Sequence, residues 1–186
     1  MADRLPRREP SAVVELRWCR LPNPDVWLER CARAFQWQRE SIRLFGKQQS
    51  VPREVAWMGT AGLNYRYSQT DHPANGWSDA VLPLRDWLAD RYPGRFNFVL
   101  ANRYLDGQDS MGWHSDDEAE LHGDVVSVSL GATRRFLLDA PDGRCALELG
   151  HGDVIQIPRA WRHALPKTRT RVGMRINLTF RELLGS

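Results

Sequence analysis

The chain of 186 residues lacks the features that mark export, membrane insertion and disulfide-linked folds. Its three cysteines, Cys19, Cys31 and Cys145, are an odd number without Cys-x-x-Cys spacing, so they indicate neither a disulfide framework nor a zinc knuckle. No apolar run approaches the roughly 20 residues that a membrane-spanning helix needs. The polar residues 1–10 contain no apolar core of an export signal. We therefore expect a cytoplasmic protein without membrane contact.

Internal repeats and low-complexity linkers are also missing. With 42% hydrophobic residues and a mean hydropathy of -0.52, the chain is long enough for one packed core. We expect a monomer with a single domain over 23–186, preceded by a partly irregular extension over 1–22.

Net charge is low, at +3, but the charged residues are segregated. Residues 154–181 hold seven basic side chains and no acidic one, whereas 105–133 hold seven acidic side chains and no lysine or arginine. With such a pattern, the acidic segment can form a metal-binding region next to a basic surface that binds a polyanion. Ordinary solvated faces explain it equally well.

Helices are predicted first and strands afterwards. Asn23-Pro24-Asp25 supplies a cap and a first-turn proline for a helix over 26–35, and apolar residues recur at helical spacing over 79–92. A period of two then predicts strands over 96–104, 125–130, 134–139, 144–149, 153–157 and 172–181. This order predicts an α+β, mainly β fold, a double-stranded β-helix or jelly roll with the N-terminal helices packed on the outside.

Histidine is scarce, and one of the five lies in the segment Trp113-His114-Ser115-Asp116. Side chains two apart on a strand or extended turn face the same side, so His114 and Asp116 are predicted to share a metal ion. Two histidines and one carboxylate on one face of an octahedral metal leave three positions for a chelating cosubstrate and dioxygen, as a non-heme Fe(II) centre requires. A structural zinc site would be closed.

His163 is the preferred third ligand. It precedes Arg175 by twelve residues, a separation that a loop and one return strand can span. His151 lies in a tight Gly-His-Gly turn and is expected to be exposed, while His122 and His72 are assigned to loops. A lone histidine is more often structural, so the assignment of His163 depends on the His-x-Asp pair and on the arginines that follow.

The last predicted strand separates polar from apolar side chains. One face carries Arg175, Asn177, Thr179 and Arg181, and the other carries Ile176, Leu178 and Phe180. Buried arginines need an anion, carboxylate side chains or water. A guanidinium group matches a carboxylate, and 2-oxoglutarate offers one carboxylate to chelate iron and another to be held at a distance. Asn102 and Tyr104 lie two apart and can face the same pocket, although a turn and core packing are equally open for them.

Four stretches carry a family resemblance: Asn102-Arg103-Tyr104-Leu105-Asp106-Gly107, Trp113-His114-Ser115-Asp116-Asp117-Glu118, Val126-Ser127-Val128-Ser129-Leu130-Gly131 and Arg175-Ile176-Asn177-Leu178-Thr179-Phe180-Arg181. Together they resemble the AlkB-type Fe(II)- and 2-oxoglutarate-dependent dioxygenases, which demethylate nucleobases oxidatively. The resemblance covers about residues 44–184, and the first forty residues carry no usable match. It is nearest to the duplex-DNA-repairing members, through Phe45-Gly46-Lys47, Val51-Pro52-Arg53 and Ala61-Gly62-Leu63.

The resemblance implies a role for each site residue. The Fe(II) ligands would be His114, Asp116 and His163. The distal carboxylate of 2-oxoglutarate would be bound by Asn102, Tyr104 and Arg175. The carboxylate near iron would be steadied by Arg181, on a face also lined by Asn177 and Thr179. Residues 23–95 would then supply helices and nucleotide-recognition hairpins, and 96–186 the catalytic jelly roll.

The implied reaction uses O2 as a second cosubstrate and releases formaldehyde, succinate and CO2. Its substrates would be bases such as 1-methyladenine and 3-methylcytosine in single- or double-stranded DNA. The alternatives are the same chemistry on RNA or protein, or a non-catalytic, cupin-like nucleic-acid-binding module. The intact pair of arginines argues against the module.

A base inside a duplex cannot reach a buried iron, so the enzyme must act on single strands or flip the nucleotide. The resemblance places Tyr65, Tyr67 and Ser68 beside the flipped base, with ordinary strand packing as the alternative for the tyrosines. The acidic residues implied to contact the base or organise its pocket are Asp117 and Glu118.

Phe45 resembles the hydrophobic finger with which duplex-acting relatives fill the gap left by a flipped base. A hairpin residue covering the core is the alternative, and Trp57 and Trp77 are rival exposed aromatics. The chain departs from the relatives at two places: Trp113 stands where others carry a polar residue, and the stretch 139–145 is short. The short stretch lacks a loop that some relatives use to grip the second strand, which bears on duplex binding.

If Phe45 is the finger, Phe45→Ala lowers turnover on methylated duplex more than on methylated single strand, because only the duplex must be unstacked at a cost of a few kcal/mol. Demethylation rates on the two substrates measure this directly. Equal losses on both would remove the finger assignment.

Overall fold

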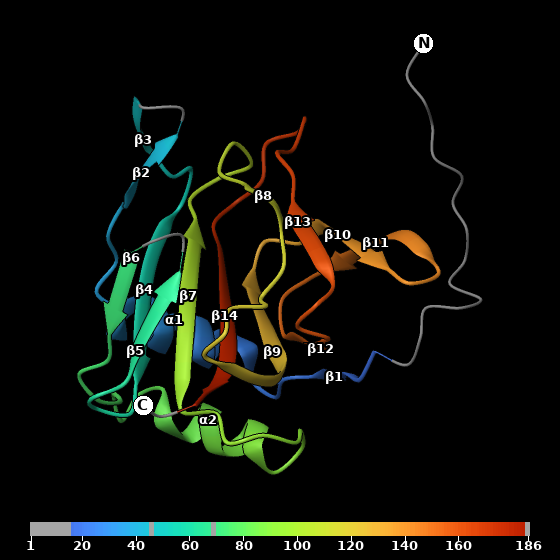
Figure 1. Cartoon of the computed structure of the whole chain (residues 1–186). Coiled ribbons are helices and arrows are strands. Elements are labelled where there is room, and N and C mark those ends of the chain that lie inside the picture. Colours follow the sequence, from blue (N-terminus) through green and yellow to red (C-terminus); the bar gives the residue numbers. More distant parts are fainter. Residues whose placement is uncertain (1–15, 45–46, 68–69, 185–186) are drawn as a thin grey trace.

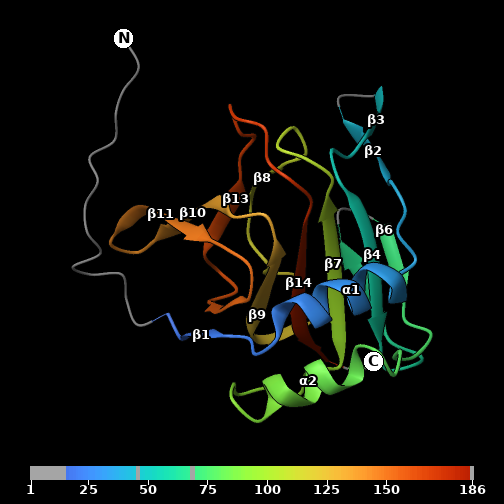
Figure 2. The same cartoon turned by 180° about the vertical axis from the view of Figure 1, so that it is seen from behind.

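Two antiparallel β-sheets face each other, and two helices cover the back of the larger sheet (Figure 1; Figure 2). The structure, a computed structural model, describes residues 16–44, 47–67 and 70–184. Within these ranges, no helix is long and apolar enough to cross a membrane. The mainly β jelly roll expected from the sequence, with its helices on the outside, is confirmed.

The larger sheet has six strands, in the order β1 (Trp18–Arg20), β12 (Asp153–Ile157), β9 (Leu121–Gly131), β14 (Arg175–Leu183), β7 (Phe98–Tyr104) and β4 (Glu54–Gly59). The smaller sheet has four, in the order β11 (Gly143–Leu149), β10 (Arg134–Ala140), β13 (Arg162–Leu165) and β8 (Met111–His114). Two hairpins complete the described chain: β2 (Ser41–Leu44) with β3 (Lys47–Ser50), and β5 (Asn64–Tyr67) with β6 (Thr70–Pro73).

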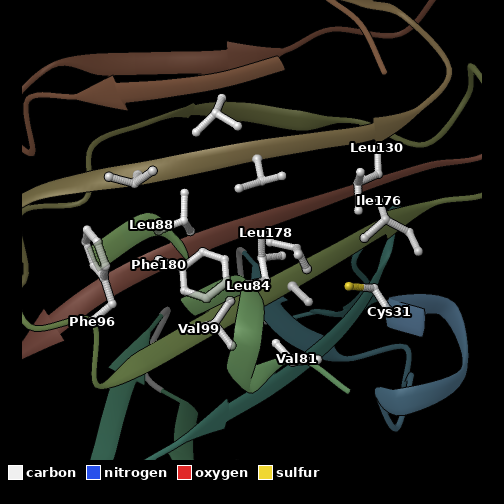
Figure 3. Close-up of a cluster of buried hydrophobic side chains, with 14 of the residues drawn as sticks. Cys31, Val81, Leu84, Leu88, Phe96, Val99, Leu130, Ile176, Leu178 and Phe180 are labelled. Atoms are coloured by element: carbon white, nitrogen blue, oxygen red, sulfur yellow. The ribbon is translucent and has the colours of Figure 1, made fainter. Parts of the chain in front are cut away.

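Strand alternation gives the larger sheet two chemically different faces. On β14, the side chains of Ile176, Leu178 and Phe180 are fully buried and point toward the helices. They pack in one cluster with residues of α1 (Pro24–Ala34) and α2 (Leu82–Ala89), as Figure 3 shows for Leu84 beside Leu178 and Phe180. Burying an aliphatic side chain contributes about 1.5–3 kcal/mol, so this layer anchors β14.

The opposite face of the larger sheet meets two partners. Toward β10, β11 and β13 it forms an apolar cluster that includes Tyr104, Leu138 and Leu165. Toward the β5–β6 hairpin it forms another, which includes Tyr65 and Phe98. The polar side chains of β7 and β14 lie on this same inner face, between the two sheets.

The helices agree with the sequence in position and differ at their ends. The first spans Pro24–Ala34 instead of 26–35. Its first turn holds the proline, as expected, but Asn23 has a left-handed φ of 49° and forms no side-chain cap. The second spans Leu82–Ala89 instead of 79–92, because residues 79–81 form a turn and a proline occupies its first turn.

The six strands predicted in the second half are present, and β12 matches 153–157 at both ends, but β8 and β13, the short strands that carry His114 and His163, were not predicted. The expected strand over 172–181 begins only at Arg175, where its pairing with Tyr104 starts, and runs to Leu183. In the first half, β4 was not predicted. Residues on both of its faces are buried, so its sequence lacks a period of two.

Residues 18–20 precede the domain boundary expected at residue 23, yet they pair with β12 as the edge of the larger sheet. The buried carboxylate of Asp153 fixes this strand, because it accepts hydrogen bonds from the Trp18 indole and the Arg20 guanidinium. The same carboxylate accepts the backbone N–H of Gly150.

Because Leu178 is fully buried at the centre of the helix-facing cluster, Leu178→Ala is expected to lower the free energy of unfolding by about 3 kcal/mol. Leu184→Ala is the matched control: this side chain is 56% exposed, and its loss should change stability by less than about 0.5 kcal/mol. Urea denaturation measures both. Similar losses in the two variants would contradict this account of the core.

Candidate metal centre

The three predicted metal ligands come together at the end of the smaller sheet. His114 ends β8 and pairs across the strands with His163 of β13, and Asp116 follows two residues after His114. One donor atom from each lies within 4.8 Å of the others. The backbone N–H of Asp116 donates to the carbonyl of Arg159, which fixes the turn that carries the carboxylate.

Both histidines are oriented by the same local contact. Nδ1 of His114 lies 2.9 Å from the carbonyl oxygen of Gly112, and Nδ1 of His163 lies 3.0 Å from that of Trp161. A carbonyl oxygen only accepts, so each Nδ1 carries a proton, and in the neutral ring Nε2 is then the atom left to bind a metal. This is the tautomer that a metal ligand needs, and a backbone partner of this kind is typical of metal-binding histidines.

The carboxylate of Asp116 is 2% exposed and has two different surroundings. Its Oδ1 accepts a 2.7 Å hydrogen bond from Nη2 of Arg181, and its Oδ2 lies 3.5 Å from Nε2 of His163. Burial by itself would raise the pKa of Asp116, but Arg181 and the two histidines outweigh burial and lower it. Burial, and next the adjacent His163, lowers the pKa of His114 to about 4.

These residues fit a divalent metal ion. At neutral pH the site offers an ionised carboxylate and neutral imidazole at His114. Oδ2 of Asp116 lies 3.5 Å from Nε2 of His163, which is longer than the roughly 2.7–2.9 Å of a charge-assisted hydrogen bond. These two ligand atoms therefore do not form a strong hydrogen bond with each other, and both can face a metal ion. Nitrogen and oxygen donors on one side, with further positions open, suit iron better than a closed structural zinc site.

A row of polar side chains continues from this cluster along the inner face of the larger sheet. Arg175 pairs with Tyr104, and Asn177 with Asn102, so all four project from the same face. The register therefore places these four side chains on one face of the larger sheet. That this face lines a cosubstrate pocket stays a prediction.

Arg175 is 1% exposed and forms no ion pair with any carboxylate of the described residues. Its Nη1 donates to the carbonyl of Leu149 and its Nη2 to the Ser129 hydroxyl, whereas its Nε has no partner. Burial lowers the pKa of Arg175 to about 10. A buried guanidinium with a free N–H and no counter-charge favours an anion at this position.

Asn102 and Tyr104 lie beside that guanidinium. The side-chain oxygen of Asn102 accepts a 2.7 Å hydrogen bond from Nε of Arg53, so its amide group is left to donate. The Tyr104 hydroxyl lies 3.8 Å from the sulfur of Met111, a weak contact that a carboxylate could replace. The sequence placed Arg53 in a stretch that resembles the family but gave it no role at this site, because it is separated from Asn102 by 49 residues.

Asn177 and Thr179 are engaged within the protein. The Asn177 amide donates to the Ser127 hydroxyl and to the carbonyl of Val128, and its oxygen accepts from the Thr179 hydroxyl. These contacts brace β14 against β9. A direct role of either residue with a cosubstrate stays a prediction.

The aromatic residues predicted to hold a base lie next to the donor cluster. The ring of Tyr67 meets that of His114 edge-on at 6.5 Å, and stacks on Tyr65 at 6.1 Å. Tyr65 is fully buried, and Arg181 lies over its ring at 5.1 Å. The Tyr65 hydroxyl and one oxygen of Glu118 are both buried and interact with each other, without a hydrogen bond of regular geometry, so this end of the site holds polar groups that a ligand can contact.

The other predicted base-contacting residues are less defined. Asp117 is exposed beside the cluster. Phe45 and Ser68 lie outside the described residues. Of their rivals, Trp57 and Trp77 are half-buried, not exposed: Trp57 packs edge-on against His72, and Trp77 stacks on Phe180.

The remaining histidines correct the sequence-based assignments. His72 belongs to β6, not to a loop: it is fully buried, with Nδ1 at 3.0 Å from the Tyr65 carbonyl and Nε2 at 2.8 Å from Glu40. His122 lies in β9, although its side chain is exposed as a loop residue's would be. His151 is half-buried because its ring accepts the N–H of Gly131.

Comparison with known proteins places this geometry in a family. The profile described as 2OG-Fe(II) oxygenase superfamily matches residues 19–181. The profile begins at residue 19, so it also spans β1 and α1, where the sequence offered no usable resemblance to the AlkB-type enzymes. A solved 2OG-Fe(II) oxygenase family oxidoreductase from Burkholderia pseudomallei has the same fold, with a TM-score of 0.55 and 18% identity over 83% of this chain and 77% of that one.

Characterised relatives are similar over most of the chain. The DNA oxidative demethylase ALKBH2 of Mus musculus is 36% identical over 173 residues, which cover 84% of this chain and 72% of the mouse protein. The Homo sapiens protein of the same name has the same identity, with 66% of its length covered. Alpha-ketoglutarate-dependent dioxygenase alkB homolog 3 of Bos taurus is 34% identical over 180 residues, with 87% of this chain and 62% of that protein covered.

Because each imidazole and the carboxylate supplies one ligand, His163→Ala and Asp116→Ala are each expected to weaken divalent metal binding by more than about 100-fold. His122→Ala, an exposed histidine on β9, is the control and should bind as tightly as the unaltered protein. Anaerobic titration calorimetry with Fe(II) measures the three affinities. Unchanged affinity in both ligand variants would place the metal elsewhere.

Proposed function

This chain belongs to the 2OG-Fe(II) oxygenase superfamily and, within it, to the AlkB-type enzymes, and we propose that it repairs DNA by oxidative demethylation of N-alkylated bases. It is an enzyme whose cofactor is Fe(II) and whose cosubstrates are 2-oxoglutarate and O2. The observation that carries the proposal is the open cluster of His114, Asp116 and His163, with a stacked tyrosine pair on one side and a buried, unpaired arginine on the other.

In this proposal His114, Asp116 and His163 hold the iron. When bound, the iron supplies the oxidation of a methyl C–H bond, coupled to the decarboxylation of 2-oxoglutarate to succinate and CO2. The protein's own part is to hold each imidazole with a proton on Nδ1, through the carbonyls of Gly112 and Trp161, so that Nε2 faces the metal, and to keep Asp116 ionised through Arg181.

The cosubstrate is oriented by the polar row on the larger sheet. Arg175 receives the distal carboxylate, with the Asn102 amide and the Tyr104 hydroxyl as further donors. Arg181, with its unpartnered Nε, steadies the carboxylate near the iron. Since both guanidinium groups come from β14, six residues apart, a single strand sets the separation of the two carboxylate positions.

The alkylated base occupies the side of the iron lined by Tyr65, Tyr67 and His114. Stacking on an aromatic ring contributes about 1–3 kcal/mol per base and offsets the cost of unstacking a nucleotide. Glu118, whose pKa is raised by burial, presents a buried carboxylate oxygen near the Tyr65 hydroxyl to the polar edge of the base. Asp117, Ser68 and Phe45 complete the proposed contacts.

The hydroxylated methyl group leaves as formaldehyde, which regenerates the base. Alkylated DNA, single- or double-stranded, is the proposed partner of a cytoplasmic monomer. RNA shares the base and its N-methyl group, and differs in its 2′-hydroxyl and helix geometry, so it is tested in parallel.

Oligonucleotides with one 1-methyladenine or 3-methylcytosine, prepared as single-stranded DNA, duplex DNA and RNA, test the proposal. Iron-loaded protein with 2-oxoglutarate is expected to remove the methyl group from at least one DNA form, as mass spectrometry of the oligonucleotide measures. Loss of the carboxylate in Glu118→Gln should lower kcat/KM by about 10- to 100-fold, since a buried polar contact to the base is lost. The control Glu120→Gln should match the unaltered enzyme. No turnover on either DNA form would refute the DNA assignment, and turnover on RNA alone would replace it.

A further inference from the structure

Tyr104 lies among three buried guanidinium groups, from Arg53, Arg134 and Arg175. All three act electrostatically on its hydroxyl, and the carboxylate that acts against them belongs to Asp109. Arg134, on β10 of the smaller sheet, is 1% exposed and lies 5.9 Å from the centre of the Tyr104 ring. It is not among the residues that the sequence indicated.

The hydrogen bonds of Arg134 go entirely to backbone carbonyls. Its Nη1 donates to Asp106 at 3.1 Å, and its Nη2 donates to Asp109 at 3.0 Å and to Pro166 at 2.7 Å. Its Nε has no partner. These bonds tie the loop after β7 to the loop after β13, but uncharged carbonyls leave the charge of the guanidinium without a counter-ion.

Two carboxylates act on Arg134 without forming an ion pair with it: Asp106 is exposed to solvent, and Asp109 is buried. Asp109 lies 3.8 Å from Arg39 and accepts the backbone N–H of Leu105. Asp153, which acts on Arg175, is paired with Arg20. Among the described residues, neither Arg134 nor Arg175 forms an ion pair. The pocket around Tyr104 therefore holds an excess of buried positive charge, which is costly unless an anion binds there.

Arg134 and Arg175 are coupled through the backbone as well as through charge. Arg134 pairs with Leu149 of β11, and the carbonyl of Leu149 accepts the hydrogen bond from Nη1 of Arg175. The like charge of Arg134 adds to burial in lowering the pKa of Arg175. A second carboxylate on the ligand would relieve both effects, whereas an uncharged end would relieve neither.

We propose that Arg134 is a positioning residue for the cosubstrate, and that its buried charge makes the pocket at Arg175 selective for 2-oxo acids with a second carboxylate. The inference rests on the proposed function in one respect, since it takes Arg175 as the residue that receives the distal carboxylate. Arg134 acts through Tyr104, Leu149 and the two loops that it joins.

Three variants separate charge from packing. Arg134→Met removes the charge at similar volume, and Arg134→Lys keeps the charge without the three carbonyl bonds. Arg135→Met removes a neighbouring charge that is exposed to solvent and serves as the matched control. Titration calorimetry on Mn(II)-loaded protein, with Mn(II) in place of Fe(II) to prevent turnover, gives Kd for 2-oxoglutarate and for 2-oxovalerate, which carries a methyl group in place of the distal carboxylate.

Arg134→Met is expected to weaken 2-oxoglutarate binding by about 10- to 100-fold, as loss of an outer-shell partner typically does, and 2-oxovalerate binding by less than about threefold. The preference for the dicarboxylate should thus collapse. Arg134→Lys should retain most of that preference, and Arg135→Met all of it. The ratio of the two Kd values does not depend on the fraction of folded protein, and thermal melting checks that each variant folds.

Two results would overturn the inference: equal weakening of both ligands in Arg134→Met, or an unchanged preference. Either result would mean that Arg134 only links the two loops and does not act on the cosubstrate. Should Arg134→Met not fold, loss of the preference in Arg134→Lys would contradict the role of charge. If the unaltered protein binds no 2-oxoglutarate, the proposed function itself fails, which is a separate outcome.

Discussion

The buried ion pair between Arg181 and Asp116 is the interaction on which the rest of the site depends. It joins the end of β14 in the larger sheet to the turn after β8 in the smaller one, at 2.7 Å and with both side chains almost fully buried. Removing one partner of such a pair typically costs 3–5 kcal/mol, because the other charge is left uncompensated. The pair keeps the carboxylate ionised, turns one oxygen toward the histidines, and places a guanidinium over the ring of Tyr65.

Charge on the inner face of the larger sheet is balanced only in part. Arg181 has a carboxylate, whereas Arg175 and Arg134 have carbonyl and hydroxyl partners alone. The uncompensated buried charge lowers the stability of the protein without a ligand and favours the binding of an anion. The apolar layer of Ile176, Leu178 and Phe180 on the opposite face offsets this loss of stability, because it packs the same strand against the helices. One strand thus carries both the core and the proposed cosubstrate site.

Much of this arrangement is predictable from sequence, because it is local or periodic. The alternation in β14 placed Arg175 and Asn177 on one face, and the His-x-Asp spacing placed two of the three ligands. Features that depend on distant contacts were missed. Nothing near Arg53 or Arg134 in the chain reveals that they meet Tyr104 from other elements. His72 was assigned to a loop because it precedes Pro73, whereas its burial comes from packing between Trp57 and Tyr65. Strand β4 was not recognised because both of its faces are covered.

The central claim is that one metal centre couples oxidation of 2-oxoglutarate to demethylation of a base held beside His114. The most direct measurement is the ratio of formaldehyde to succinate released with a methylated oligonucleotide that the enzyme accepts. The account predicts one formaldehyde for each succinate at early times, and far less succinate when the same oligonucleotide lacks the methyl group. Succinate release that is identical with and without the methyl group, and without formaldehyde, would contradict it.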